Sequence, residues 1–235
     1  MRSFYLTALV LGLLTAVGPL AINMYLPALP VIEDVFDTDT ATVQLSLLSF
    51  FVSMSLAQLI YGPLSDMFGR RLPLFIGLTL YLLGAVGSAL APDIQWLIAA
   101  RALQGLGAAA GMVIARAVIR DLYTGPQAAQ LMATLMLVVS IAPVLAPLAG
   151  SAALAAGGWR TIFWSMAAAA IAALVLLTTA LKETRPPNSA ATAALHARSG
   201  TTQAFCANRG FSASSLLAHS GWPASWPMWR TRPSS

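Results

Sequence analysis

The sequence predicts an all-α polytopic membrane protein, and three observations support that prediction. Hydrophobic residues make up 58% of the 235 positions and charged residues only 9%, whereas soluble domains carry about 25% charged residues. The mean hydropathy is +0.76. The charged residues are spaced so that uncharged stretches long enough to cross a bilayer as helices, about 20 residues each, lie between them. This pattern argues against a soluble enzyme, a nucleic-acid-binding domain and a disordered chain.

Six membrane spans follow from the spacing of the charges. We place them at residues 5–29, 43–62, 73–91, 95–118, 128–150 and 161–181. The uncharged stretch 122–159 is too long for one span, and turn-forming residues divide it at Tyr123–Pro126 and Gly157–Gly158. A cleaved signal peptide is the alternative for the first span, but its uncharged run is longer than the hydrophobic region of a signal peptide. We therefore expect residues 1–181 to form one six-helix bundle.

The basic residues predict the orientation of these spans. With the N-terminus inside, the inner loops hold Arg2, Arg70, Arg71, Arg120, Lys182 and Arg185. The outer loops then hold Glu33, Asp34, Asp37, Asp39 and Asp93, with Arg160 as their one basic residue. Because cytoplasmic loops are enriched in Lys and Arg, we expect the N- and C-termini to be cytoplasmic.

Residues 182–235 differ in composition from the six spans. Residues 1–181 hold seven Arg and seven acidic residues, so the net charge of +5 belongs entirely to residues 182–235. This tail also holds Cys206, His196 and His219, the only Cys and His residues of the chain. We therefore expect no nucleic-acid binding, disulfide, Cys/His metal site or His-based triad in the bundle. The tail contains no further span, and we expect it to be cytoplasmic, irregular and disordered.

The loop between the second and third spans carries a recognisable pattern. Residues 62–71 read GPLSDMFGRR and resemble the signature loop of the major facilitator superfamily, G-x-x-x-D-(R/K)-x-G-R-R, with Met67 in place of the first basic residue. The matching residues are Gly62, Asp66, Gly69, Arg70 and Arg71. Gly62 would allow close helix packing and Gly69 a tight turn. The resemblance implies that Asp66, Arg70 and Asp121 form an ion-pair relay at the inner gate; three solvated loop charges are the alternative.

Three more stretches narrow the resemblance. Residues 101–105 (RALQG) look like the R-x-x-Q-G motif of the superfamily. Residues 142–150 (APVLAPLAG) are similar to the antiporter motif of drug/proton exchangers, matched at Pro143, Pro147 and Gly150. Residues 23–30 (NMYLPALP) look like the D-M-Y-L-P-A-x-P signature of the bicyclomycin-resistance (Bcr/CflA) branch, which Arg120–Asp121 also fits. The resemblance covers residues 1 to about 185 and implies the N-terminal half of a twelve-span fold.

Four residues are candidates for handling protons or substrate: Arg101, Gln104, Asn23 and Tyr25. Arg101 lies about 10 Å into the fourth span at 1.5 Å per residue, where a charge needs a wet cavity or a partner, and Gln104 lies one turn on. Snorkelling to the outer surface is the alternative for Arg101. Tyr25, Phe50 and Phe51 are candidate cavity-lining aromatic residues. Asn23 stands where the resemblance implies a proton-exchanging Asp, and Asn cannot titrate.

The resemblance implies a multidrug (drug/proton) efflux antiporter of the cell inner membrane, moving small lipophilic drugs against protons with no cofactor and no metal. An enzyme is not expected, because the spans contain no nucleophile with a base. An inactive membrane fragment or interaction partner is one alternative, and a half-size transporter working as a homodimer is another. The resemblance and the acid/base balance both stop near Pro187, so we favour a change of reading frame over a regulatory tail, and we expect residues 1–235 alone not to transport.

Overall fold

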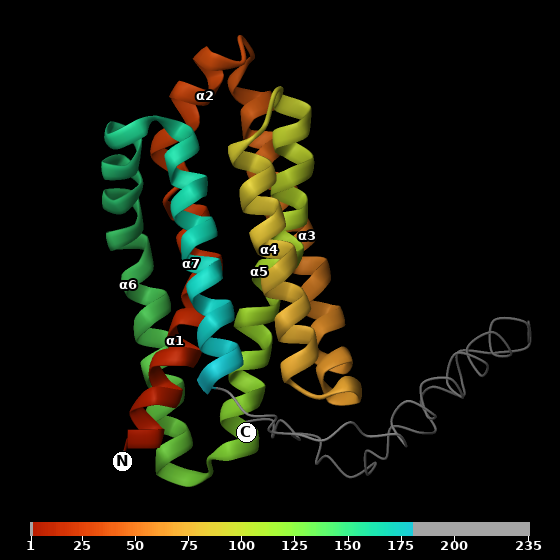
Figure 1. Ribbon diagram of the computed structural model, residues 1–235, viewed down its shortest axis with the longest axis vertical. Helices are drawn as coiled ribbons and strands as arrows, with labels where there is room; N and C mark the ends of the chain where they lie inside the picture. Colours follow the sequence, from red (N-terminus) through yellow and green to blue (C-terminus); the bar gives the residue numbers. More distant parts are fainter. Residues whose placement is uncertain (1, 181–235) are drawn as a thin grey trace, which may run out of the picture. The chain divides into compact units, whose positions relative to one another are not determined.

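The computed structural model describes residues 2–180, which form helices running back and forth between two ends (Figure 1). Six segments are long and apolar enough to cross a membrane, which confirms the predicted number of spans. The elements are α1 (Arg2–Asn23), η1 (Leu26–Ala28), α2 (Leu29–Val35), α3 (Thr40–Phe68), α4 (Arg71–Ala89), α5 (Ile94–Leu122), α6 (Gly125–Gly157) and α7 (Trp159–Ala180). The described part of the chain is thus all-α, as predicted, and the predicted tail lies outside it.

The turns between the helices form where the sequence places turn residues. In the uncharged stretch 122–159, helix α6 ends at Gly158. Gly158 has a φ of 79°, a left-handed conformation that glycine adopts at little cost. Pro126 lies in the first turn of α6, where its missing N–H costs nothing. Asp93 caps α5, because its carboxylate accepts a hydrogen bond of 2.7 Å from the Trp96 backbone N–H. The predicted divisions on both sides of α6 are confirmed.

The first span is broken, which the sequence analysis did not predict. We expected one helix over residues 5–29, but α1 ends at Asn23 and the chain continues through the short helix η1 into α2. Pro27 and Pro30 explain the break, because neither has a backbone N–H to donate to the carbonyl four residues earlier, and Pro30 lies in the first turn of α2, where this costs nothing. The first membrane-crossing segment therefore runs from Thr7 to Val35 through α1, η1 and α2 in succession.

Helix α5 lies at the centre of the bundle because three of its glycines face the backbones of three other helices. A Cβ at Gly105 would overlap the Phe50 carbonyl oxygen of α3, and one at Gly107 would overlap the Tyr81 backbone nitrogen of α4. A Cβ at Gly111 would overlap the Leu14 carbonyl oxygen of α1. Small residues let membrane helices approach this closely. The side chains of α5 next to these glycines are therefore held inside the bundle.

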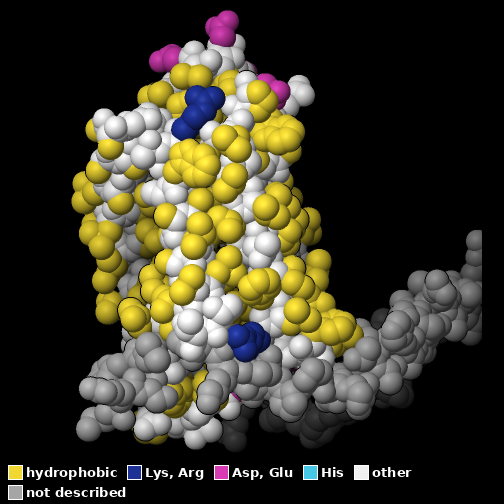
Figure 2. Space-filling view, viewed as in Figure 1, with side chains coloured by type: hydrophobic (Ala, Val, Ile, Leu, Met, Phe, Trp, Pro, Cys, Tyr) yellow, Lys and Arg dark blue, Asp and Glu magenta, His cyan; other side chains and the backbone are white. Residues whose placement is uncertain are grey.

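The outside of the bundle is apolar between two polar ends. Figure 2 shows hydrophobic side chains along the middle of the molecule and acidic side chains gathered at the top of the view. Large exposed hydrophobic residues are concentrated on α3 and α6: Leu45, Leu48, Phe51, Val52, Leu56, Leu59, Ile60, Met136, Leu137, Ile141, Val144, Leu145 and Leu148. An apolar belt of this kind is the surface that a bilayer covers. The described residues thus form a multi-pass membrane bundle.

Candidate functional site

Arg101 lies on α5, completely buried, with 0% of its surface exposed. Its Nη1 donates a hydrogen bond of 2.7 Å to Oε1 of Gln104 and a longer one of 3.4 Å to the Ala21 carbonyl of α1. Gln104 is held in turn, since its Nε2 lies 3.5 Å from the Met166 sulfur on α7. The predicted pairing of Arg101 and Gln104 on one helix face is confirmed. Arg101 therefore does not extend its side chain to the outer surface of the membrane.

Three aromatic rings surround the Arg101 guanidinium. Its central carbon lies 4.5 Å from the ring centroid of Tyr25 and 4.4 Å from that of Phe50. Phe163 of α7 lies 5.9 Å away. The negative faces of aromatic rings attract a cation, by about 2 kcal/mol or more where water is excluded. These contacts compensate part of the cost of burying the charge. We call Arg101, Gln104, Tyr25, Phe50 and Phe163 the Arg101 site.

Tyr25 is fixed at the break in the first span by a buried hydroxyl pair. Its hydroxyl lies 2.7 Å from the hydroxyl of Ser46 on α3. Ser46 donates its own proton to the Val43 carbonyl at 2.6 Å, so Tyr25 is the donor to Ser46. The ring of Tyr25 also packs against Phe163, with centroids 5.6 Å apart. The break therefore places an aromatic side chain beside the buried charge.

Sequence reasoning found part of the Arg101 site and missed the rest. Tyr25 and Phe50 join it, whereas Phe51, predicted beside them, is 41% exposed and faces outward. Phe163 was missed. Its one signal is the i, i+4 spacing from Trp159, which places both rings on one face of α7, with centroids 6.0 Å apart. Nothing in the sequence indicates that this face of α7 lies against the first span.

Asn23 is close in sequence to Tyr25, but its side chain is bonded to its own helix. Its Nδ2 donates a hydrogen bond of 2.7 Å to the Pro19 carbonyl. The contacts of Arg101 with the first span are instead made by Ala21, near the end of α1, and by Tyr25, just after it. Of these two residues, Tyr25 contacts the Arg101 guanidinium, whereas the side chain of Asn23 is bonded to Pro19.

Residues 142–150, which resemble an antiporter motif, pack α6 against the first span. Ala142, Ala146 and Gly150 are buried at i, i+4 and i+8, so the small residues form one stripe along the helix. A Cβ at Gly150 would overlap the Met24 carbonyl oxygen, which places this glycine against the break in the first span. Pro143 and Pro147 lie beside the stripe, and α6 continues through both. The small residues at these three positions thus allow α6 to pack closely against the first span.

Arg70 is the centre of an ion-pair cluster at the end of α3. Its Nη1 lies 2.8 Å from Asp66, and its Nε donates at 2.7 Å to Asp121 at the end of α5. Nη1 also donates at 2.6 Å to the Ser65 hydroxyl. Burial alone would lower the pKa of Arg70, but its ion pairs with Asp121 and Asp66 outweigh that effect and raise it. The predicted trio of Asp66, Arg70 and Asp121 is thus brought together.

The other residues of the signature loop have different surroundings. Gly69 has a φ of 84°, which a residue with a side chain rarely adopts, and this turns the chain from α3 into α4. Arg71 donates a hydrogen bond of 3.1 Å to the Thr178 carbonyl of α7. The expected packing role of Gly62 is wrong, because a Cβ there would meet no described atom of another helix within 4 Å. Gly62 points away from the neighbouring helices.

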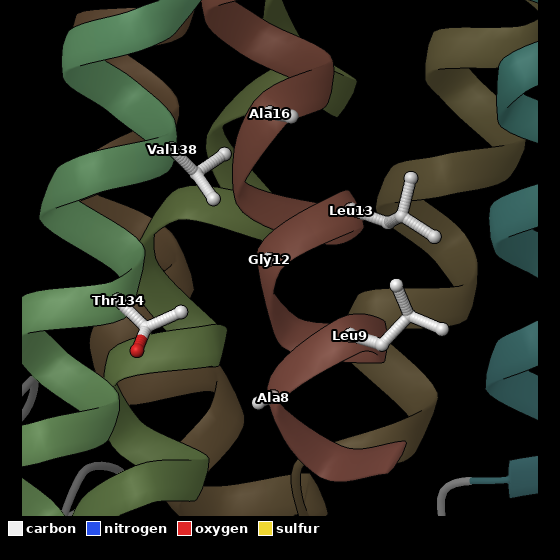
Figure 3. Close-up of a pocket in the computed structure, with 7 residues that line it drawn as sticks. All are labelled: Ala8, Leu9, Gly12, Leu13, Ala16, Thr134 and Val138. Carbon is white, nitrogen blue, oxygen red and sulfur yellow. The ribbon is translucent and has the colours of Figure 1, made fainter. Parts of the chain in front are cut away.

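An apolar groove lies between α1 and α6, on the part of α1 away from the break. It has a volume of about 430 Å³ and is lined by Ala8, Leu9, Gly12, Leu13, Ala16, Thr134 and Val138. Figure 3 shows Val138 pointing from α6 toward Gly12 of α1, and a Cβ at Gly12 would lie 3.6 Å from Val138. The absence of a side chain at Gly12 keeps the groove open.

Comparison with known proteins gives a family match over most of the chain. A model described as Major Facilitator Superfamily matches residues 11–232. The uncharacterized MFS-type transporter YdgK of Bacillus subtilis (strain 168) is 41% identical over 181 residues, covering 76% of this chain and 45% of YdgK. Multidrug resistance protein MdtL of Escherichia coli O139:H28 is 35% identical over 173 residues, covering 74% of this chain and 44% of MdtL. The chain spans about half the length of these curated relatives.

Solved structures show the same fold. The proton:xylose symporter XylE aligns with a TM-score of 0.70 at 18% identity, over 78% of this chain and 46% of XylE. The human organic anion transporter MFSD10 aligns with a TM-score of 0.66 at 19% identity, over 78% of this chain and 49% of MFSD10. The described bundle therefore has the architecture of one six-helix half of these twelve-helix proteins.

Proposed function

Because the chain belongs to the major facilitator superfamily, we propose that it forms the N-terminal half of a multidrug efflux antiporter, of the drug/proton group and the Bcr/CflA branch. The observation that carries the proposal is Arg101, a buried charge in a bundle whose other described charges lie toward the helix ends. A charge inside a membrane bundle is costly and marks a substrate or ion pathway. The 35% identity to a multidrug resistance protein supports drugs as the cargo.

Each part of the bundle receives a role in this proposal. Arg101, Gln104 and Tyr25 contact substrate or protons near the middle of the membrane, where transporters of this type bind their cargo. Asp66, Arg70 and Asp121 hold the inner gate closed through their ion pairs. The apolar groove beside Gly12 supports a lipophilic drug as the cargo. Because Asn23 cannot titrate, proton coupling depends on residues elsewhere in the transporter.

Transport requires a second six-helix unit. Alternating access works by one half of such a transporter rocking against the other around a central site. We propose that residues 1–181 are one such unit and that residues 182–235 are a cytoplasmic tail. A homodimer, in which a second copy supplies the other half, remains the alternative that a transport assay separates from this proposal.

Transport can be tested with the chain and with a chimera. In the chimera, residues 1–181 replace the matching segment of Escherichia coli MdtL. Cells with the chimera should accumulate several-fold less of a lipophilic dye or antibiotic than empty-vector cells, and a protonophore should remove the difference. Intact MdtL is the positive control. Residues 1–235 alone should not lower accumulation, and export by them would favour the homodimer. A membrane-inserted chimera that exports nothing in the panel would contradict the proposal.

We also propose that the protein lies in the cell inner membrane with its N- and C-termini in the cytoplasm. The exposed acidic residue Asp34 on α2 would then face outward, and the exposed Gln127 near the start of α6 would face inward. In a Cys206→Ser background, Asp34→Cys should react with an impermeant maleimide added to whole cells. Gln127→Cys should react only after the cells are opened. The reverse labelling pattern would overturn the orientation.

A further inference from the structure

The buried guanidinium of Arg101 has hydrogen-bonding capacity that the described residues do not use. Its Nη1 is bonded to Gln104 and to Ala21, whereas Nε and Nη2 have no hydrogen-bond partner. A buried N–H group without a partner is rare, and at a charged group it is especially costly. Two such groups on one fully buried side chain are therefore the part of the site that a ligand would bind.

The two unpaired nitrogens form one edge of the guanidinium plane. Nε–H and the adjacent Nη2–H make the fork that matches the two oxygens of a carboxylate in a bidentate pair. Gln104 occupies the other side of the group, through Nη1 at 2.7 Å, and so holds this edge at a fixed angle. Arg70 shows the same use of the fork elsewhere in this bundle, with Nε and Nη2 directed at the two oxygens of Asp121.

Arg101 also lacks a counterion among the described residues. Both ion pairs recorded within the described residues belong to Arg70, and no carboxylate there lies within 4 Å of Arg101. Residue 23, in the adjacent first span, is an amide whose nitrogen is bonded to Pro19. A buried cation without an anion favours an anionic ligand and disfavours a cationic one.

We propose that the Arg101 site binds the carboxylate of a small aromatic organic acid, with the carboxylate on Nε and Nη2 of Arg101. Tyr25, Phe50 and Phe163 surround the charge in this conformation, and Phe50 of α3 and Phe163 of α7 provide the apolar contact for the ring of the ligand. The proposal rests on the proposed transport function and specifies its substrate class. Arg101 is completely buried in this conformation, so the ligand reaches the fork when the first span moves away from α3 and α7.

Binding of radiolabelled benzoate to residues 1–235 in lipid nanodiscs tests the proposal, with empty nanodiscs as the blank. Unlabelled benzoate should displace the label. Benzamide, which is neutral, and benzylamine, which is cationic, should compete at least about tenfold more weakly, because neither can pair with the fork as an anion. Acetate should also compete at least about tenfold more weakly, because it lacks the ring. Competition by benzylamine equal to that of benzoate would overturn the proposed preference for an anion. Competition by acetate equal to that of benzoate would overturn the proposed preference for an aromatic ring.

Variants of two arginines on the same helix complete the test. Arg101→Gln should abolish benzoate binding. Arg101→Lys should weaken it at least about tenfold, because lysine keeps the charge but lacks the fork. The matched control Arg116→Gln, at an exposed position of α5, should bind like the parent chain. Size-exclusion chromatography checks folding, and Arg101→Lys carries the test if Arg101→Gln does not fold. Unchanged binding by the folded Arg101 variants would overturn the proposal.

The outcomes for binding and transport are separable. If the chimera exports drugs while residues 1–235 do not bind benzoate, this inference is wrong and the proposed function stands. If residues 1–235 bind benzoate through Arg101 while the inserted chimera exports nothing, the proposed function is wrong and the anion site stands.

Discussion

Replacement of Arg101 by alanine is expected to reduce drug export by the MdtL chimera to the level of empty-vector cells, with membrane insertion unchanged. Arg101 is the one completely buried charge of the described residues, and its loss removes the cation that three aromatic rings surround. Gln104 also loses the donor to its Oε1. Drug accumulation in growing cells measures the effect, and immunoblotting of the membrane fraction measures insertion.

Arg116→Ala is the matched control for this experiment. Arg116 lies on the same helix but is exposed, so its removal should leave export close to that of the unmodified chimera. Export by Arg101→Ala equal to that of Arg116→Ala would show that the buried guanidinium has no part in transport, and the role proposed for it would be wrong.

Replacement of Gly107 by alanine is expected to have the second large effect, on stability. The added methyl group would overlap the Tyr81 backbone nitrogen and the Gly77 carbonyl oxygen of α4. Backbone atoms cannot rotate away as a side chain can, so α4 and α5 must separate. Overpacking of this kind lowers the free energy of unfolding by about 1–3 kcal/mol. Unfolding of the purified chain by increasing amounts of a denaturing detergent measures the loss.

Gly62→Ala provides the minimal pair for the glycine experiment. The substitution adds the same methyl group to a helix, but at Gly62 the methyl group would meet no atom of the described residues within 4 Å apart from its chain neighbours and the nearby backbone of its own helix. Its free energy of unfolding should stay within about 0.5 kcal/mol of the parent value. Equal destabilisation by the two substitutions would mean that the close approach of α4 and α5 does not decide the result, since the helix propensity of alanine favours both substitutions.

The number of spans could be predicted because charges interrupt the apolar sequence at regular intervals. The break in the first span could not be located in the same way, because residues 3–32 contain no charge at all. Prolines indicate that a helix is weakened, but they do not say whether neighbouring helices compensate. In α6, the helix continues through Pro143 and Pro147, whereas at Pro27 it gives way to η1.

The candidate sites could be predicted where the partners are close in sequence. Arg101 and Gln104 are one turn apart, so helical geometry alone places them together. The link between Arg70 and Asp121 spans 51 residues and was expected from a family resemblance, not from spacing. The contacts of Phe163 and Ser46 depend on how α7 and α3 pack against the broken first span. Gly62 was misjudged because a glycine in a motif does not reveal which way it faces.

The rings beside the break also bear on how the two parts of the first span move. Tyr25, just after α1, packs on Phe163, and Phe36, just after α2, packs on Trp159 with centroids 5.5 Å apart. Each such pair contributes about 0.5–1.5 kcal/mol beyond its buried area. Together they favour the arrangement in which residues 25–36 lie against α7 by about 1–3 kcal/mol, a ratio of roughly 5 to 150. A ligand whose affinity for the two arrangements differs by that factor is enough to make their populations equal, and reversing the populations takes the square of that factor.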